Sequence, residues 1–233
     1  MLEAVFLRHD GLDAIRMAIG LASVLSACVY LRFVGAPAAP LRTANKTLTV
    51  ALLALLPLTY LASGANGTVI AGLALALALS ALGDFFLALK DQQRFFVPGL
   101  ASFLAAHIAY VAVFIPHTAM PNAAALAIIV ATIAAAGLFL IRIAPNLGKL
   151  KLPVFAYFAV IMAMVATALS IPNASWLLGA GAILFALSDS LIAVRKFMRP
   201  VPGINEAVWV TYCAAQFMIA AALLALLVPA QIG

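Results

Sequence analysis

The chain has 233 residues, of which 67% are hydrophobic and only 9% are charged, and its formal net charge is +6. A soluble domain of this length carries roughly 25% charged residues, so the composition excludes a soluble globule and indicates a membrane protein. We do not expect a nucleic-acid partner, because the basic residues lie in short connections between apolar runs and are typical of topology signals.

Eight apolar runs follow one another along the chain, most of them close to the roughly 20 residues that a spanning helix needs. We predict membrane helices over 14–34, 48–63, 68–89, 97–115, 122–141, 153–171, 175–194 and 207–228. The second run is short and contains Pro57, which favours a kinked or only partly spanning helix. The sequence therefore predicts an all-α, polytopic bundle of eight transmembrane helices that forms a single integral-membrane domain over 1–233.

The connections between these runs differ sharply in charge. Those after the first, third, fifth and seventh runs hold eleven Lys and Arg residues, counting Lys46 just before the second run. The other connections hold none, and the amino-terminal segment holds only Arg8 and Arg16. By the positive-inside rule, the basic side faces the cytoplasm and both termini lie outside.

One short sequence occurs twice, deep in the third and seventh runs. Ala81-Leu82-Gly83-Asp84 recurs 105 residues later as Ala186-Leu187-Ser188-Asp189, and a basic residue follows each aspartate after six residues. Each carboxylate then lies roughly 9 Å inside the cytoplasmic end of its helix. Acids at that depth are costly and usually mark ion, proton or substrate pathways. The match also suggests a 4+4 parallel internal repeat, although the halves are dissimilar elsewhere.

Other polar residues gather in the same cytoplasmic halves of the runs. His107 and Tyr110 are three apart, and Tyr212 and Gln216 are four apart, so each pair shares a helix face. We predict a polar pocket open to the cytoplasm, with Asp84 and Asp189 as catalytic residues. The substrate-binding candidates are Lys46, at the start of the second run, and His107, Tyr110, Tyr157, Tyr212 and Gln216.

Each candidate also has a purely structural interpretation. A buried aspartate can pair with a basic residue, and Lys46 can anchor a helix start. Tyrosines can belong to an interfacial belt, and Gln216 can join two helices. The chain contains no phosphate-binding loop, nucleophile elbow or zinc motif. Asp84, Asp189 and His107 have no diagnostic metal-ligand spacing, so we expect a site without a metal or other cofactor.

The same residues resemble the lysoplasmalogenase family of YhhN-like membrane proteins. The resemblance rests on Gly83-Asp84, His107-x-x-Tyr110, Tyr157 with Met162, Ser188-Asp189 and Tyr212-x-x-Ala215-Gln216. It covers nearly the whole chain from Lys46, although Thr47 stands where the family pattern has proline. The resemblance implies hydrolysis of the vinyl ether of lysoplasmalogen, a lysophospholipid substrate, to a fatty aldehyde and a glycerophospho-base. We expect the protein in a bacterial inner membrane among membrane lipids, with its site toward the cytoplasm.

Vinyl ethers are hydrolysed by acid catalysis, through protonation of the β-carbon and an oxocarbenium ion. Two carboxyl groups in a low-dielectric pocket favour one protonated and one ionised group, which this chemistry needs. The sequence does not say which aspartate is the acid, and Lys46 is a candidate for the phosphate. A proton-coupled transporter or a non-catalytic binder of an amphiphilic lipid is the alternative. The alanine-rich composition favours a bacterial source, so another lysolipid or ether also remains open as the substrate.

Overall fold

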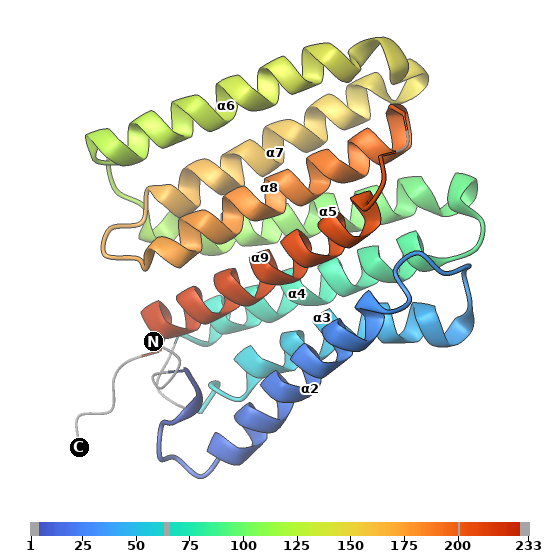
Figure 1. The fold of residues 1–233 in the computed structure, drawn as a ribbon. Helices are drawn as coiled ribbons and strands as arrows, with labels where there is room; N and C mark the ends of the chain where they lie inside the picture. Colours follow the sequence, from blue (N-terminus) through green and yellow to red (C-terminus); the bar gives the residue numbers. More distant parts are fainter. Residues whose placement is uncertain (1–4, 63–65, 200, 229–233) are drawn as a thin grey trace.

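A computed structural model describes residues 5–62, 66–199 and 201–228 (Figure 1). Its described part contains eight long α-helices and no β-strand, which confirms the predicted all-α bundle. The helices are α2 (Asp13–Leu31), α3 (Pro40–Leu58), α4 (Gly67–Ala88), α5 (Gln92–Phe114), α6 (Ala123–Ile143), α7 (Lys151–Leu169), α8 (Trp176–Phe197) and α9 (Ile204–Leu227). Every apolar run that we identified therefore contains a helix.

Successive helices run in opposite directions along the bundle (Figure 1). The start of α2 and the end of α9 lie at one end, on the left in Figure 1, and α4 and α8 run in the same direction. All connections rich in Lys and Arg therefore meet at the opposite end, which we call the basic end. The location of the basic end in the cytoplasm stays a prediction.

Seven of the eight described long helices are long and apolar enough to cross a membrane, and α3 is the exception. Its 19 residues extend roughly 28 Å, close to the thickness of a bilayer core, so its length is sufficient. Polar residues in its first half lower its hydropathy instead. Whether α3 spans the membrane therefore stays a prediction.

The start of α3 differs from our prediction. We placed it at 48, but the helix begins at Pro40, whose fixed φ suits a first helical position, and Lys46 lies in its second turn. Some of the polar residues before 48 have partners inside the bundle, as when the Thr43 hydroxyl donates to the Ala88 carbonyl. Pro57 lies in the last turn, so it is next to the helix end rather than at a central kink.

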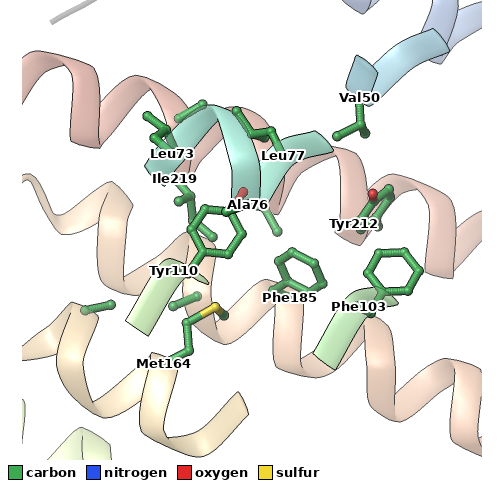
Figure 2. Close-up of a cluster of buried hydrophobic side chains, with 14 of the residues drawn as sticks. Val50, Leu73, Ala76, Leu77, Phe103, Tyr110, Met164, Phe185, Tyr212 and Ile219 are labelled. Carbon is green, nitrogen blue, oxygen red and sulfur yellow. The ribbon is translucent and has the colours of Figure 1, made fainter. Parts of the chain in front are cut away.

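The core lies between α3, α4, α5, α7, α8 and α9. Figure 2 shows Leu73, Tyr110, Met164, Phe185 and Ile219 from five of these helices around a common centre. Helix α6 is peripheral, since Ile129 and Ile143 are its only buried described residues. Large apolar side chains are exposed over the outer surface, as expected for a protein whose solvent is lipid.

Helices α4 and α5 approach each other closely just beside Asp84. A Cβ atom at Gly83 would lie 2.6 Å from the ring of Phe103, and one at Gly99 would lie 2.6 Å from the Leu87 side chain. Small residues at helix contacts allow backbones to come together inside a membrane. Gly83 thus allows α4 to pack closely against α5 directly beside Asp84.

Candidate active site

Asp84 is held by donors on both of its carboxylate oxygens. The Lys46 ammonium of α3 lies 3.0 Å from Oδ1, and the Tyr212 hydroxyl of α9 donates to Oδ2 at 2.7 Å. The aspartate is 1% exposed and the lysine side chain 14% exposed, so this is a buried ion pair. A lysine partner and a hydrogen bond stabilise the ionised form of a buried carboxylate. Asp84 is therefore arranged as a fixed anion.

A polar contact between α2 and α3 sets the direction of Lys46. The Asn45 amide and the Thr49 hydroxyl each donate to Ser26 Oγ at 2.9 Å. Ser23 Oγ donates to the Thr49 carbonyl at 2.6 Å. These bonds fix the rotation of α3 about its axis and so turn Lys46 toward α4. We did not predict this cluster, whose signal in the sequence is the spacing of Ser23 and Ser26 within an apolar run.

Asp189 has different surroundings. The Tyr157 hydroxyl of α7 donates to Oδ2 at 2.5 Å, and His107 Nε2 of α5 lies 3.6 Å from the same oxygen. No described residue forms a hydrogen bond with Oδ1 or an ion pair with Asp189 through Lys or Arg. One oxygen of this carboxyl group is thus oriented by protein, and the other is available to carry a proton or to meet a ligand.

His107 is fully buried, and neither ring nitrogen has a hydrogen-bond partner of normal geometry among the described residues. Its ring contacts the rings of Tyr157 and Phe185, with centroid separations of 5.3 and 4.6 Å. Buried polar groups are normally paired, and the Asp189 carboxyl oxygen lies 3.6 Å from Nε2 of this imidazole.

Tyr110 and Gln216 belong to the Asp84 network. The Tyr110 hydroxyl donates to Gln216 Oε1 at 2.7 Å, and Gln216 Nε2 lies 3.3 Å from the Tyr212 hydroxyl. Both residues are almost completely buried, and their polar atoms contact other side chains of the network. The structure therefore joins all six predicted binding residues to the two aspartates. Four of them lie on the Asp84 side, and His107 and Tyr157 lie on the Asp189 side.

Phe185 lies between the two networks. Its ring centroid is 4.6 Å from that of His107 and 5.5 Å from that of Tyr212. Figure 2 shows this ring between Tyr110 on one side and Phe103 and Tyr212 on the other. The two aspartates therefore have separate sets of partners within one buried region.

The contacts of the two aspartates follow the 105-residue offset seen in the sequence. Tyr212 stands 105 residues after His107, as Asp189 does after Asp84, and each ring faces the aspartate of the other half. The contact between Gly83 and Phe103 likewise corresponds to the one between Ser188 and Val208, where Ser188 Oγ donates to the Val208 carbonyl. These equivalent positions support an internal repeat, and the His107–Tyr212 offset was a signal that our sequence analysis did not use.

A cavity reaches Asp189 from the basic end of the bundle. It is small, with a volume of about 30 Å³, and Asp189 and Tyr157 are its polar lining residues. Its other walls are apolar and include Leu100, Phe103, Val154 and Phe158, with Phe96 and Phe197 where α5 begins and α8 ends. Asp84 does not line this cavity. A small ligand in this cavity would thus meet Asp189 without meeting Asp84.

The described residues contain no group of three or more His, Cys, Asp or Glu side chains that could hold a metal ion. The Asp84 network instead contains a lysine and two tyrosines, which are donors suited to a carboxylate rather than to a cation. The expectation of a site without a metal or other cofactor stays a prediction.

The fold and the site together define a polytopic helical membrane protein with two buried acidic groups among aromatic and basic side chains. The YhhN family model matches residues 41–223, and the chain belongs to this family. No solved structure matches the chain.

Several curated proteins are similar to the chain. The lysoplasmalogenase of Mycobacterium tuberculosis is 36% identical over 150 residues, which cover 63% of this chain and 58% of that protein. Lysoplasmalogenase TMEM86B of Homo sapiens is 35% identical over 145 residues, covering 62% and 59%. Lysoplasmalogenase TMEM86A of Bos taurus is 35% identical over 153 residues, covering 62% and 61%. The chain thus spans about three fifths of the length of these relatives.

Proposed function

We propose that this protein hydrolyses the vinyl ether bond of lysoplasmalogen, or of a closely related lysolipid, to a fatty aldehyde and a glycerophospho-base. Membership of the YhhN family and relatives named lysoplasmalogenase support this activity. The observation that carries the proposal is the difference between the two aspartates. Donors occupy both oxygens of Asp84, whereas Asp189 lines a cavity with one oxygen free of protein partners.

Asp189 is the acid in this proposal. A buried carboxylate without a cationic partner is costly, whereas the neutral acid is tolerated at the same place. Tyr157 holds Oδ2, so the proton resides on Oδ1. This oxygen is the one that no described residue binds, so it can deliver the proton to a substrate carbon.

The reaction requires one proton transfer to carbon and one water molecule. The Asp189 proton bonds to the β-carbon of the vinyl ether, using the π electrons of the double bond, and the adjacent carbon becomes an oxocarbenium ion. Water adds to this carbon and loses a proton to the Asp189 carboxylate, which restores the acid. The hemiacetal then loses its glycerol oxygen as an alcohol, and the aldehyde is released. Buried His107, next to Asp189 Oδ2, is placed to orient the water.

Asp84 supplies a permanent negative charge in the network on the other side of Phe185. Lys46 and Tyr212 keep it ionised and prevent it from competing for the transferred proton. Tyr110 and Gln216 support Tyr212 from behind, so we assign them to positioning rather than to substrate contact. Lys46 acts on Asp84 in this scheme, and another group must bind the phosphate.

The cavity opens toward the basic end, so we place the active site on the cytoplasmic side of a bacterial inner membrane.

The test is mass spectrometry of lysoplasmalogen after incubation with detergent-purified protein. We expect fatty aldehyde from the wild type and none from Asp189→Asn, which keeps the shape of the carboxyl group but cannot donate its acidic proton. Glu206→Gln is the matched control, because Glu206 is an exposed acid in the first turn of α9, and it should retain full activity. Aldehyde production by Asp189→Asn would contradict the assigned role. Intact lipid with the wild type, together with proton flux in liposomes, would favour the transporter.

A further inference from the structure

The substrate class proposed above carries a phosphate, and the Asp84 network does not offer a free cation to bind it. The Lys46 ammonium lies 3.0 Å from Asp84, and a second anion there would compete with that carboxylate. A phosphate in a lipid environment prefers arginine, whose planar guanidinium can donate two parallel hydrogen bonds. The phosphate is therefore expected in a pocket of the basic end that is lined by arginines without a carboxylate partner.

Such a pocket lies where α6 and α8 end. Arg142 in the last turn of α6, Asn146 just after it, and Arg199 after α8 line about 1080 Å³ of space, open solvent included. None of the described residues that line it is acidic. Neither guanidinium forms a hydrogen bond or an ion pair with a described residue. Both arginines are exposed and border the same concave surface, so both guanidinium groups are available to an anion that enters from the basic end.

This pocket adjoins the cavity that contains Asp189. Phe197, the last residue of α8, forms part of the wall of both. Asp189 lies eight residues before Phe197, or roughly 12 Å along the helix axis. In a lysoplasmalogen, seven covalent bonds join the phosphorus atom to the vinyl β-carbon, which spans roughly 9 Å when extended. Arginine side chains reach several ångströms beyond their backbone, so one lipid can span the two sites.

We propose that Arg142 and Arg199 bind the phosphate of the lysolipid head group while its vinyl ether reaches Asp189. This inference rests on the proposed function and adds the part of the site that recognises the head group. It also gives a role to α6, which buries only Ile129 and Ile143 within the described residues. The peripheral helix contributes Arg142 to the pocket, and Phe197 lies where the glycerol must pass.

The experiment compares two substrates that differ only in the phosphate: alkenyl lysophosphatidylethanolamine and the corresponding 1-O-alkenylglycerol. We would measure KM for both in nanodiscs of zwitterionic lipid, for the wild type and for Arg142→Gln/Arg199→Gln. A charge-assisted contact contributes about tenfold in affinity, so the double variant should raise KM for the phospholipid by roughly 10- to 100-fold. The KM for alkenylglycerol should stay unchanged. Arg32→Gln/Lys149→Gln removes the same charge from exposed residues of the basic end outside the pocket, and it should behave as the wild type.

Equal KM changes for both substrates, or equal changes in both double variants, would overturn the proposal. An effect that appears only when anionic lipid is added to the nanodisc would also overturn it, because the arginines would then bind bilayer lipid. If the wild type hydrolyses neither substrate, the proposed function fails separately. Equilibrium binding of the non-hydrolysable alkyl-ether lysophosphatidylethanolamine then decides the inference, which requires a Kd at least about tenfold weaker for Arg142→Gln/Arg199→Gln. An unchanged Kd would refute it.

Discussion

At the scale of single residues, the ion pair between Lys46 and Asp84 links two buried side chains, and the proposed scheme also assigns it a part in catalysis. Lys46→Met should destabilise the protein by about 3–5 kcal/mol, because it leaves a buried carboxylate without its cation. The double variant Lys46→Met/Asp84→Leu should recover most of this loss, since apolar side chains can replace a buried ion pair at little cost. Turnover should nevertheless remain low in the double variant, because the fixed anion is gone.

Unfolding in detergent, followed by circular dichroism, measures the stability part of this prediction, and aldehyde release measures the catalytic part. If the single and double variants unfold at the same temperature, the two side chains do not form the pair described above. If the double variant regains full turnover, Asp84 has no part in the reaction and the proposed scheme reduces to Asp189 alone.

Two tyrosine hydroxyls allow a matched comparison of the two networks. Tyr157→Phe removes the donor to Asp189 Oδ2 but keeps the ring that packs against His107, and we expect kcat to fall roughly 10- to 100-fold. Tyr110→Phe removes a hydroxyl that contacts only the Gln216 end of the Asp84 network, so its effect on kcat should be several-fold at most. Steady-state kinetics decide between them, and equal losses would contradict the assignment of Asp189 as the acid.

At the scale of helices, the close contact between α4 and α5 makes Gly83 sensitive to the smallest substitution. Gly83→Ala places a Cβ 2.6 Å from the buried Phe103 ring, so either the ring or the helix must move. We expect a loss of about 1–3 kcal/mol in stability and a larger loss in turnover, because Asp84 follows directly. Gly137→Ala in α6 is the control, since no atom lies within 4 Å of its Cβ position. Equal unfolding temperatures for the two variants would contradict this account.

The helices themselves followed from the sequence, because lipid exposure demands long apolar runs and leaves the connections as the natural place for charge. The start of α3 did not follow from it. Polar residues such as Thr43 and Asn45 ended our predicted run, although partners on α4 and α2 allow them inside the bundle. Hydropathy counts each residue alone, whereas these residues are tolerated because of bonds to helices that are distant in sequence or separated by a loop.

The same limit applies to the site. Depth and spacing were enough to select Asp84, Asp189 and their polar neighbours as a group. Which donor meets which carboxylate depends on contacts across 128 residues for Tyr212 and 82 for His107, and a single sequence does not specify these. The sequence therefore did not distinguish the roles of the two aspartates. The proposed assignment of one as an anion and the other as an acid rests on their contacts alone.

At the scale of the whole molecule, a network of contacts around Arg16 lies at the end of the bundle opposite the basic end. This fully buried arginine donates to both oxygens of Asp10 at 2.6 Å and to Asp13 at 3.1 Å, and it lies over the ring of Tyr60. It also donates to the carbonyl and the hydroxyl of Thr59, each at 3.1 Å. The arginine thereby fastens the segment before α2 to the end of α3.

The hydrogen bonds of Arg16 predict a pH dependence of stability that is independent of the active site. The hydrogen bond from Arg16 lowers the pKa of Asp10 from 3.8 to about 2, so the folded state binds this proton less readily than the unfolded state does. The contribution of this hydrogen bond to stability is therefore fully present above about pH 4 and is lost as the pH falls toward 2.

Asp10→Asn removes this contribution at every pH. The difference in unfolding temperature between wild type and Asp10→Asn should thus be constant from pH 7 to about 5 and shrink toward zero near pH 2. A difference that stays constant down to pH 2 would show that Asp10 is protonated equally in both states, and that Arg16 holds this end of the bundle through Asp13, Thr59 and Tyr60 instead.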